Sequence, residues 1–138
     1  SYSGVFGPNA TQSDVYKHVA APLVEGLFPQ KNSMDELGES ALLFTLGVTN
    51  AGKTHTVMGK GFETKADKSK MEKDGFLPGD NWGIIPRSLD HMLRRVDGLN
   101  KEAGSTGQPQ LQMYMSYLEI YNEKIYDLLP DKSTQAPR

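Results

Sequence analysis

The chain has 138 residues, 37% of them hydrophobic and 23% charged, which indicates one globular domain and leaves no room for a second. Its formal net charge of −2 lacks the basic excess of a dedicated nucleic-acid-binding protein, so we expect no nucleic-acid partner. The absence of cysteine excludes disulfides and cysteine-based zinc sites, and the longest apolar run is too short for a membrane-spanning helix, so we expect no membrane partner.

The first predicted element is a helix over residues 14–28. Thr11 and Asp14 are typical of its start, because a threonine hydroxyl can accept from the backbone N–H three residues later and an acid favours the positive helix end. Pro22 removes one backbone hydrogen bond and predicts a kink, since the apolar pattern continues beyond it. The helical spacing of apolar residues predicts one buried face made of Val15, Tyr16, Val19, Ala20, Leu23, Val24, Leu27 and Phe28.

A polar stretch over residues 29–40 predicts a loop. The apolar run 41–46 after it predicts a buried strand, because it is too short for a helix and is bounded by a glycine. A loop over residues 47–54 follows, and a helix is expected to begin near its end. Residues 59–83 are polar and rich in lysine and glycine, which predicts an exposed insertion.

Trp82 lies at the end of this insertion, where it could contact a ligand or anchor the loop to the following helix. We favour the anchor. That helix is predicted over residues 84–96, with Pro86 in its first turn and Gly98 near its end. The elements after it are predicted as a loop over 97–110, a strand over 111–121, a turn over 122–124 and a second strand over 125–129.

The loop over residues 47–54 matches the full phosphate-loop pattern of nucleotide-binding proteins. Gly47 and Gly52 allow a sharp exit from the strand and a close approach of backbone N–H groups to phosphate oxygens. Lys53 supplies a cation for the β- and γ-phosphates, and the Thr54 hydroxyl can ligate Mg²⁺. A glycine-rich turn alone would not explain why lysine and threonine follow in that order.

We therefore predict a nucleotide-binding site with Lys53 and Thr54 as catalytic residues and Thr54 as the metal ligand. The residues predicted to hold the phosphates are Gly47, Val48, Thr49, Asn50, Ala51, Gly52, Lys53 and Thr54. His55, directly after the loop, could stack on a purine or could cap the side of the first helical turn.

Four segments of the chain resemble the motor domain of kinesins, namely residues 5–12, 43–59, 83–87 and 116–129. The last segment is the most specific, because a phosphate loop alone fits many nucleotide hydrolases. The resemblance implies an α/β fold with a P-loop NTPase-like central sheet and flanking helices. It also implies ATP and Mg²⁺ as cofactors, His55 near the adenine, and ATP hydrolysis coupled to movement along microtubules.

The loop sequence over residues 48–50 looks more like the mitotic, cytokinesis-linked kinesins than the transport kinesins. Leu46 stands where the family usually has a tyrosine, a departure with little effect on phosphate chemistry. The resemblance further implies a location in the cytoplasm on microtubules of the cytoskeleton, including those of the mitotic spindle.

The family's arginine-rich adenine motif, its two switch motifs, its microtubule-facing helix and its neck are not found within residues 1–138. We therefore expect a partial motor domain that is inactive alone and is a microtubule-stimulated ATPase as part of the full motor domain. Microtubules would be contacted through parts of the domain outside this chain, and a coiled coil outside it would form a homodimer. Two alternatives stay open: a truncated or degenerate kinesin-like binding module without turnover, and another P-loop NTPase.

Overall fold

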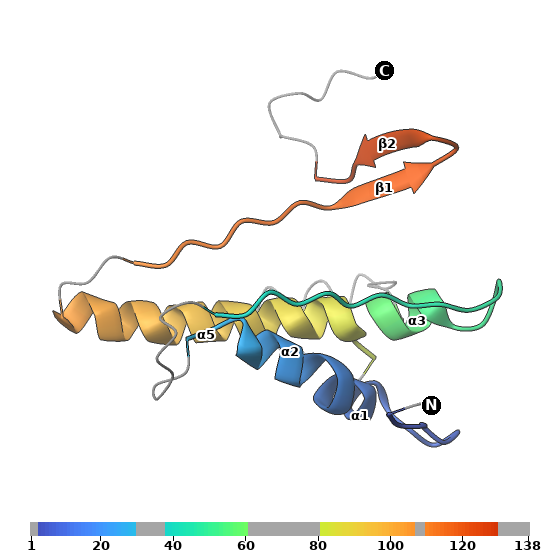
Figure 1. Cartoon of the computed structure of the whole chain (residues 1–138), viewed down its shortest axis with the longest axis horizontal. Coiled ribbons are helices and arrows are strands. Elements are labelled where there is room, and N and C mark those ends of the chain that lie inside the picture. The colour runs from blue at the N-terminus through green and yellow to red at the C-terminus, as the bar shows by residue number, and fades with distance from the viewer. Residues whose placement is uncertain (1–2, 30–37, 61–80, 107–109, 130–138) are drawn as a thin grey trace, which may run out of the picture. The chain divides into compact units, whose positions relative to one another are not determined.

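The computed structural model describes residues 3–29, 38–60, 81–106 and 110–129 (Figure 1). These residues form two compact units, Ser1–Gly98 and Leu99–Arg138. The first unit contains the N-terminal helical segment, the phosphate-loop sequence and most of the longest helix. The second contains the end of that helix and a β-hairpin.

The N-terminal helical segment has three parts: α1 (Gln12–Val15), the π-helix η1 (Tyr16–Ala20) and α2 (Ala21–Gly26). Its predicted start is confirmed, because the Asp14 N–H donates to Thr11 Oγ1 over 3.1 Å and the Thr11 N–H donates to the Asp14 carboxylate over 2.9 Å. This reciprocal pair is a capping box.

Pro22 lies in the first turn of α2, directly after the π-helix. Proline has no N–H to donate, so a helix tolerates it best near its own start. The π-helix η1 ends at Ala20 and α2 begins at the next residue, so Pro22 falls at a new helix start. The chain thus accommodates Pro22 by changing from π-helix to α-helix. The helical segment ends at Gly26, two residues before the predicted boundary.

Helix α3 (Lys53–Met58) and helix α5 (Ile84–Thr106) follow in the chain. Helix α5 begins where the sequence predicts but continues beyond Gly98, so the predicted loop over 97–110 is wrong for residues 97–106. A single glycine weakens a helix interior by only about 1 kcal/mol. The helix formers at 101–103 are enough to continue the helix past it.

The two ends of the predicted insertion are joined to each other. Gly59 and Trp82 form an isolated antiparallel bridge, and the Gly83 N–H donates to Met58 O over 3.2 Å. Trp82 is only 8% exposed, which confirms its predicted role as an anchor. The predicted exposed insertion over 59–83 is therefore too wide at its C-terminal end, and residues 61–80 lie outside the described residues.

The predicted buried strand over residues 41–46 is wrong for this structure. The segment is extended, but it has no strand partner among the described residues, and Leu42, Phe44 and Leu46 are 83%, 69% and 85% exposed. A strand exists only where a neighbour accepts and donates its backbone hydrogen bonds. The predicted central sheet with flanking helices is thus not formed within the described residues, whose sheet has two strands.

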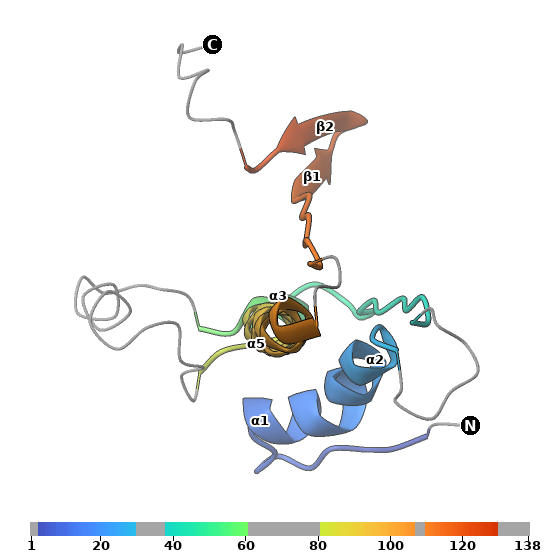
Figure 2. The same cartoon turned by 90° about the vertical axis from the view of Figure 1, so that its left-hand side faces the viewer.

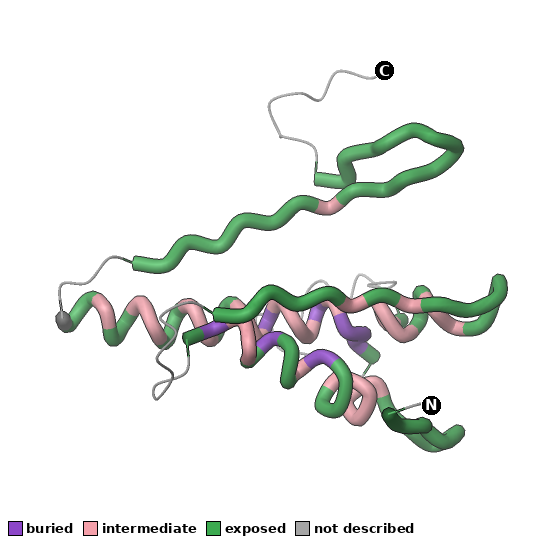
Figure 3. Tube along the Cα trace, viewed as in Figure 1, coloured by how far each residue is buried: buried purple, intermediate pink, exposed green. Residues whose placement is uncertain are grey.

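The core of the first unit lies between α2 and the start of α5 (Figures 2 and 3). Its buried apolar residues are Ala20, Val24, Phe28, Trp82 and Ile84. Three of these belong to the predicted apolar face of the first helix, while Val19 and Leu23 of that face are 38% and 37% exposed. Among the described residues, no helix is both long and apolar enough to cross a membrane.

The second unit contains a two-stranded antiparallel hairpin of β1 (Leu118–Tyr121) and β2 (Lys124–Asp127). Asn122 and Glu123 have φ values of 49° and 60°, the left-handed pair that a tight two-residue hairpin turn requires. The predicted hairpin is confirmed, but its first strand is shorter than the predicted 111–121 and all residues of both strands are exposed.

Candidate functional site

Residues 47–52 form a mostly exposed loop that leads into α3, whose first two residues are Lys53 and Thr54. The Ala51 N–H donates to Val48 O over 3.1 Å and closes a turn inside the loop. Gly52 precedes the helix with φ of 89°, a left-handed conformation that favours glycine. Within the described residues, no side-chain hydrogen bond caps this helix start, and the backbone N–H groups of a first helical turn have no intrahelical acceptor. The loop therefore offers the backbone donors that a phosphate group accepts.

The loop leaves little room for a side chain at Gly47. A Cβ atom built there would lie 3.2 Å from the Cβ atom of Ala51 and 3.8 Å from Cγ of Lys53. At the first distance, the Ala51 side chain would have to shift by a few tenths of an ångström. Gly47 therefore lies against Ala51 and Lys53, and a larger residue at this position would disturb the turn.

Lys53 places its ammonium group against the beginning of the loop. Its Nζ donates to Gly47 O over 2.7 Å and to Val48 O over 2.8 Å. The structure therefore brings together both ends of the predicted phosphate-binding segment around one positive charge. Thr54, the second residue of α3, is exposed, and its hydroxyl is the oxygen ligand that the sequence assigns to Mg²⁺.

His55 is the third residue of α3 and is held by a residue that sequence reasoning missed. Gln12 Nε2 donates to His55 O over 2.6 Å and lies 3.1 Å from His55 Nδ1. The two residues are 43 positions apart, so no local spacing could have paired them. The only available signal was that Gln12 ends the first of the four segments with a family resemblance.

A second polar cluster, also missed from the sequence, lies between η1, α2 and α5. Tyr16 Oη is 2.8 Å from His91 Nδ1, His91 Nε2 is 2.7 Å from Glu25 Oε1, and Arg95 Nε is 3.6 Å from Glu25 Oε2. Burial is the largest influence on Tyr16 and raises the pKa of its hydroxyl. This cluster contains none of the predicted nucleotide-binding residues.

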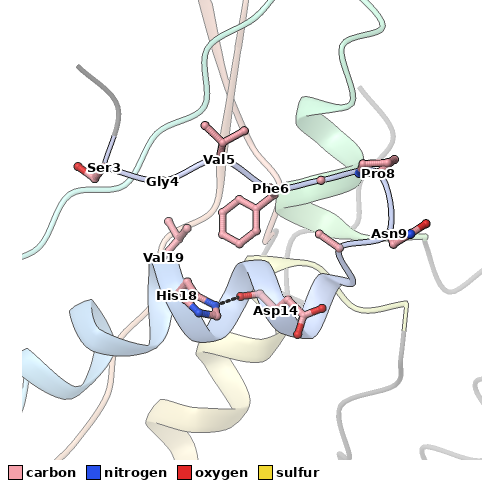
Figure 4. Close-up of a pocket in the computed structure, with 11 residues that line it drawn as sticks. Ser3, Gly4, Val5, Phe6, Pro8, Asn9, Asp14, His18 and Val19 are labelled. Carbon is pink, nitrogen blue, oxygen red and sulfur yellow. Dashed lines mark hydrogen bonds between the residues drawn. The ribbon is translucent and has the colours of Figure 1, made fainter.

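A pocket of about 830 Å³ lies between the N-terminal residues 3–10 and the start of the helical segment (Figure 4). On its wall, the rings of Phe6 and His18 meet edge to face with centroids 5.9 Å apart, and His18 Nδ1 donates to Asp14 O over 2.8 Å. Hydrogen bonds from the side chain and the backbone of Thr11 hold the pKa of Asp14 below its ordinary value. No residue of the 47–54 loop lines this pocket.

The family model described as the kinesin motor domain matches residues 1–138, the whole chain. The chain belongs to the kinesin motor-domain family. This confirms the resemblance inferred from the four segments. Kinesin motor domains in general bind nucleotide with Mg²⁺ and are microtubule-stimulated ATPases.

Curated relatives of this kinesin chain come from animals, fungi and plants. It is 36% identical over 133 residues to Kinesin-like protein Klp61F of Drosophila melanogaster, covering 96% of this chain and 10% of that protein. It is 34% identical over 140 residues to Kinesin-like protein KIF21B of Mus musculus, covering 99% of this chain and 7% of that protein. It is 33% identical over 129 residues to Kinesin-like protein 6 of Schizosaccharomyces pombe, covering 94% of this chain and 12% of that protein.

The kinesin chain thus spans between 7% and 12% of the length of these three relatives. No solved structure matches it. The branch suggested by residues 48–50 stays a prediction.

Proposed function

We propose that this chain is the ATP-binding part of a kinesin motor that couples ATP hydrolysis to movement along microtubules. The observation that carries the proposal is the closed loop over residues 47–54, with Lys53 Nζ bonded to the carbonyl groups of Gly47 and Val48. This loop occurs in a chain that matches the kinesin motor domain from residue 1 to residue 138.

In the proposed site, residues 47–54 hold the phosphates of ATP. The two hydrogen bonds of Lys53 Nζ keep its positive charge beside the loop. Its ammonium group would exchange these neutral carbonyl acceptors for phosphate oxygens, because hydrogen bonds between ions are roughly twice as strong as neutral ones. The Thr54 hydroxyl would bind Mg²⁺, which when bound neutralises charge on the β- and γ-phosphates.

His55 is proposed to stack on the adenine. It directly follows the phosphate-binding residues on α3, its side chain is exposed, and its ring has the flat face that base stacking requires. A base attached to phosphates held in the loop would lie near the first turn of this helix.

Residues 41–46 are proposed to be a strand of a central P-loop NTPase-like sheet in the complete motor domain. The exposed apolar side chains of Leu42, Phe44 and Leu46 support this, since packing of the sheet face against flanking helices would remove them from water. We also propose that ATP hydrolysis, binding to microtubules and location on the cytoskeleton are properties of the complete motor protein that contains this chain. Residues 1–138 alone are proposed to bind ATP without rapid turnover.

The test is to measure the steady-state ATPase rate of the complete motor protein with and without polymerised tubulin. We expect polymerised tubulin to raise kcat severalfold, and Lys53→Ala to abolish the increase. Unpolymerised tubulin at equal concentration is the matched control. A rate that polymerised tubulin leaves at background would contradict the motor function, and phosphorylation of a metabolite without tubulin would point to another P-loop enzyme.

A further inference from the structure

Gln12 connects the first helix to the helix of the phosphate loop through a single carboxamide. Its Nε2 donates to His55 O over 2.6 Å and lies 3.1 Å from His55 Nδ1. Gln12 is the first residue of α1, and His55 is the third residue of α3. The backbone and the ring of one histidine are thus held by the same side chain.

The chemistry of the two groups determines the form of the ring. The nitrogen of a carboxamide carries two hydrogens and only donates, so His55 Nδ1 must accept. A neutral imidazole that accepts at Nδ1 carries its hydrogen at Nε2. The bond therefore selects one tautomer, and the second bond to His55 O fixes where the ring lies relative to α3.

The position of Gln12 is itself fixed by its neighbours. The capping box of Thr11 and Asp14 surrounds Gln12 in the sequence, with the Thr11 hydroxyl also donating to the Asp14 carboxylate over 2.7 Å. His55 O additionally accepts from the Gly59 N–H over 2.9 Å, within the last turn of α3. Both ends of the Gln12 contact thus belong to hydrogen-bonded backbone, so the contact can orient a ring rather than follow it.

We propose that Gln12 is a positioning residue for recognition of the purine base. It holds His55 in the Nε2–H tautomer and fixes the ring face on which the base of a purine nucleoside triphosphate stacks. This inference rests on the proposed function, in which residues 47–54 hold the phosphates. Gln12 then affects the binding of the base and not the binding of the phosphates.

The first test compares two ligands by titration calorimetry on the full chain: Mg-ATP and Mg-tripolyphosphate, which has the phosphates but no base. Gln12→Ala should weaken Mg-ATP binding by about 2- to 12-fold, the range expected when one aromatic stacking contact is lost. The affinity for Mg-tripolyphosphate should not change. Ser13→Ala, at the next position of α1, is the matched control and should change neither affinity.

The second test reads the tautomer without any ligand, from the imidazole ¹⁵N resonances of His55, assigned by their loss in His55→Asn. The unmodified chain should show the hydrogen at Nε2. Gln12→Glu has nearly the same shape, but its carboxylate only accepts, so the hydrogen should move to Nδ1. This variant also keeps the inference testable if Gln12→Ala does not fold, which circular dichroism would reveal.

The outcomes separate the two proposals. Equal losses of affinity for both ligands in Gln12→Ala, or a His55 tautomer that is the same in Gln12→Glu, would overturn the role of Gln12 while leaving the phosphate site in place. If the unmodified chain binds neither ligand, the proposed function fails, and the positioning role fails with it.

Discussion

His91 Nε2 on α5 donates to Glu25 Oε1 on α2 over 2.7 Å. The other ring nitrogen, Nδ1, lies 2.8 Å from Tyr16 Oη, so one imidazole bonds both η1 and α2. A neutral ring satisfies both contacts, since Nε2–H donates to the carboxylate and Nδ1 accepts from the phenol. Helix α5 is thereby joined to the N-terminal helical segment by polar contacts beside the small apolar core.

His91→Ala removes both of these hydrogen bonds. We expect the free energy of unfolding to fall by about 1 kcal/mol, a modest loss because the side chains of His91 and Glu25 are 27% and 48% exposed. Urea denaturation followed by circular dichroism measures it. His18→Ala is the control, since His18 donates to Asp14 O of its own helical segment and contacts the Phe6 ring but makes no hydrogen bond to another helix within the described residues, so it should cause a smaller loss. Equal losses in the two variants would argue against the interhelical role.

The stability of the first unit should decline at high pH because of Tyr16. Burial raises the pKa of Tyr16 above its ordinary value of 10.0, although its hydrogen bond to Ser88 opposes this. The folded chain therefore keeps the phenolic proton to higher pH than the unfolded chain. The stability that depends on protonated Tyr16 is fully present below the ordinary pKa of tyrosine and is lost as the pH rises through the raised pKa of Tyr16.

Tyr16→Phe should remove the part of the stability loss at high pH that Tyr16 causes. It should also lower the free energy of unfolding by about 1 kcal/mol at neutral pH, because the hydrogen bond to His91 is lost. Urea unfolding at a series of pH values between about 8 and 11 measures both effects. Tyr114→Phe, at a position 87% exposed, is the control and should leave the pH dependence unchanged. An identical pH dependence in Tyr16→Phe and the unmodified chain would contradict the assignment.

Gly59→Ala should weaken the contact between the end of α3 and the residues directly before α5. Gly59 has φ of 87°, and a Cβ atom there would collide with Asn81 O and lie 2.5 Å from Gly83 N. We expect a loss of at least about 1–3 kcal/mol in unfolding free energy, from backbone strain together with the broken bridge to Trp82. The fluorescence of Trp82, the single tryptophan, reports the same change.

Gly98→Ala is the matched control for this substitution. Gly98 lies inside α5, is exposed, and has nothing within 4 Å of a built Cβ atom. Alanine should therefore stabilise the helix by about 0.5–1 kcal/mol. Changes of the same sign in both variants would contradict the close approach at Gly59.

Lys53→Ala should remove most of the affinity for Mg-ATP. Loss of one charge-assisted contact with phosphate corresponds to a decrease of about tenfold or more. Fluorescence anisotropy of a labelled ATP analogue measures it on the full chain. Lys60→Ala removes an equal charge two residues after α3 and should have little effect. If both variants bind ATP as tightly as the unmodified chain, the phosphate site is assigned wrongly.

Thr54→Asn should weaken the dependence of ATP binding on Mg²⁺. The longer amide replaces the hydroxyl that is proposed to bind the metal, so adding Mg²⁺ should increase the affinity severalfold less than in the unmodified chain. Thr54→Ser keeps the hydroxyl and should keep the response. Titrating Mg²⁺ at constant ATP compares the three proteins, and an unchanged response in Thr54→Asn would exclude Thr54 as the ligand.

Features that depend on neighbouring residues were predictable from the sequence. The capping box of Thr11 and Asp14 and the turn at Asn122 and Glu123 involve residues at most three positions apart. The pattern that predicts a phosphate loop over residues 47–54 could be recognised in the same way, because its glycines, lysine and threonine occur at a characteristic spacing. The anchor role of Trp82 followed from its position directly before a helix.

Predictions that depended on more distant parts of the chain were less successful. The run 41–46 has the composition of a buried strand, but strand formation requires a neighbouring strand, which no local pattern supplies. The end of α5 was misplaced because Gly98 weakens a helix without ending it, and the residues after it decide whether the helix continues.

The sequence alone therefore predicted the chemistry of the loop and identified the family resemblance, since both depend on residue identities at short spacings. Tertiary structure alone decided which distant side chains meet. Gln12 contacts His55 across 43 positions, and Tyr16 contacts His91 across 75. Such pairs form only when separate helices pack together, because the spacing of residues along a chain carries no information about the distance between two helices.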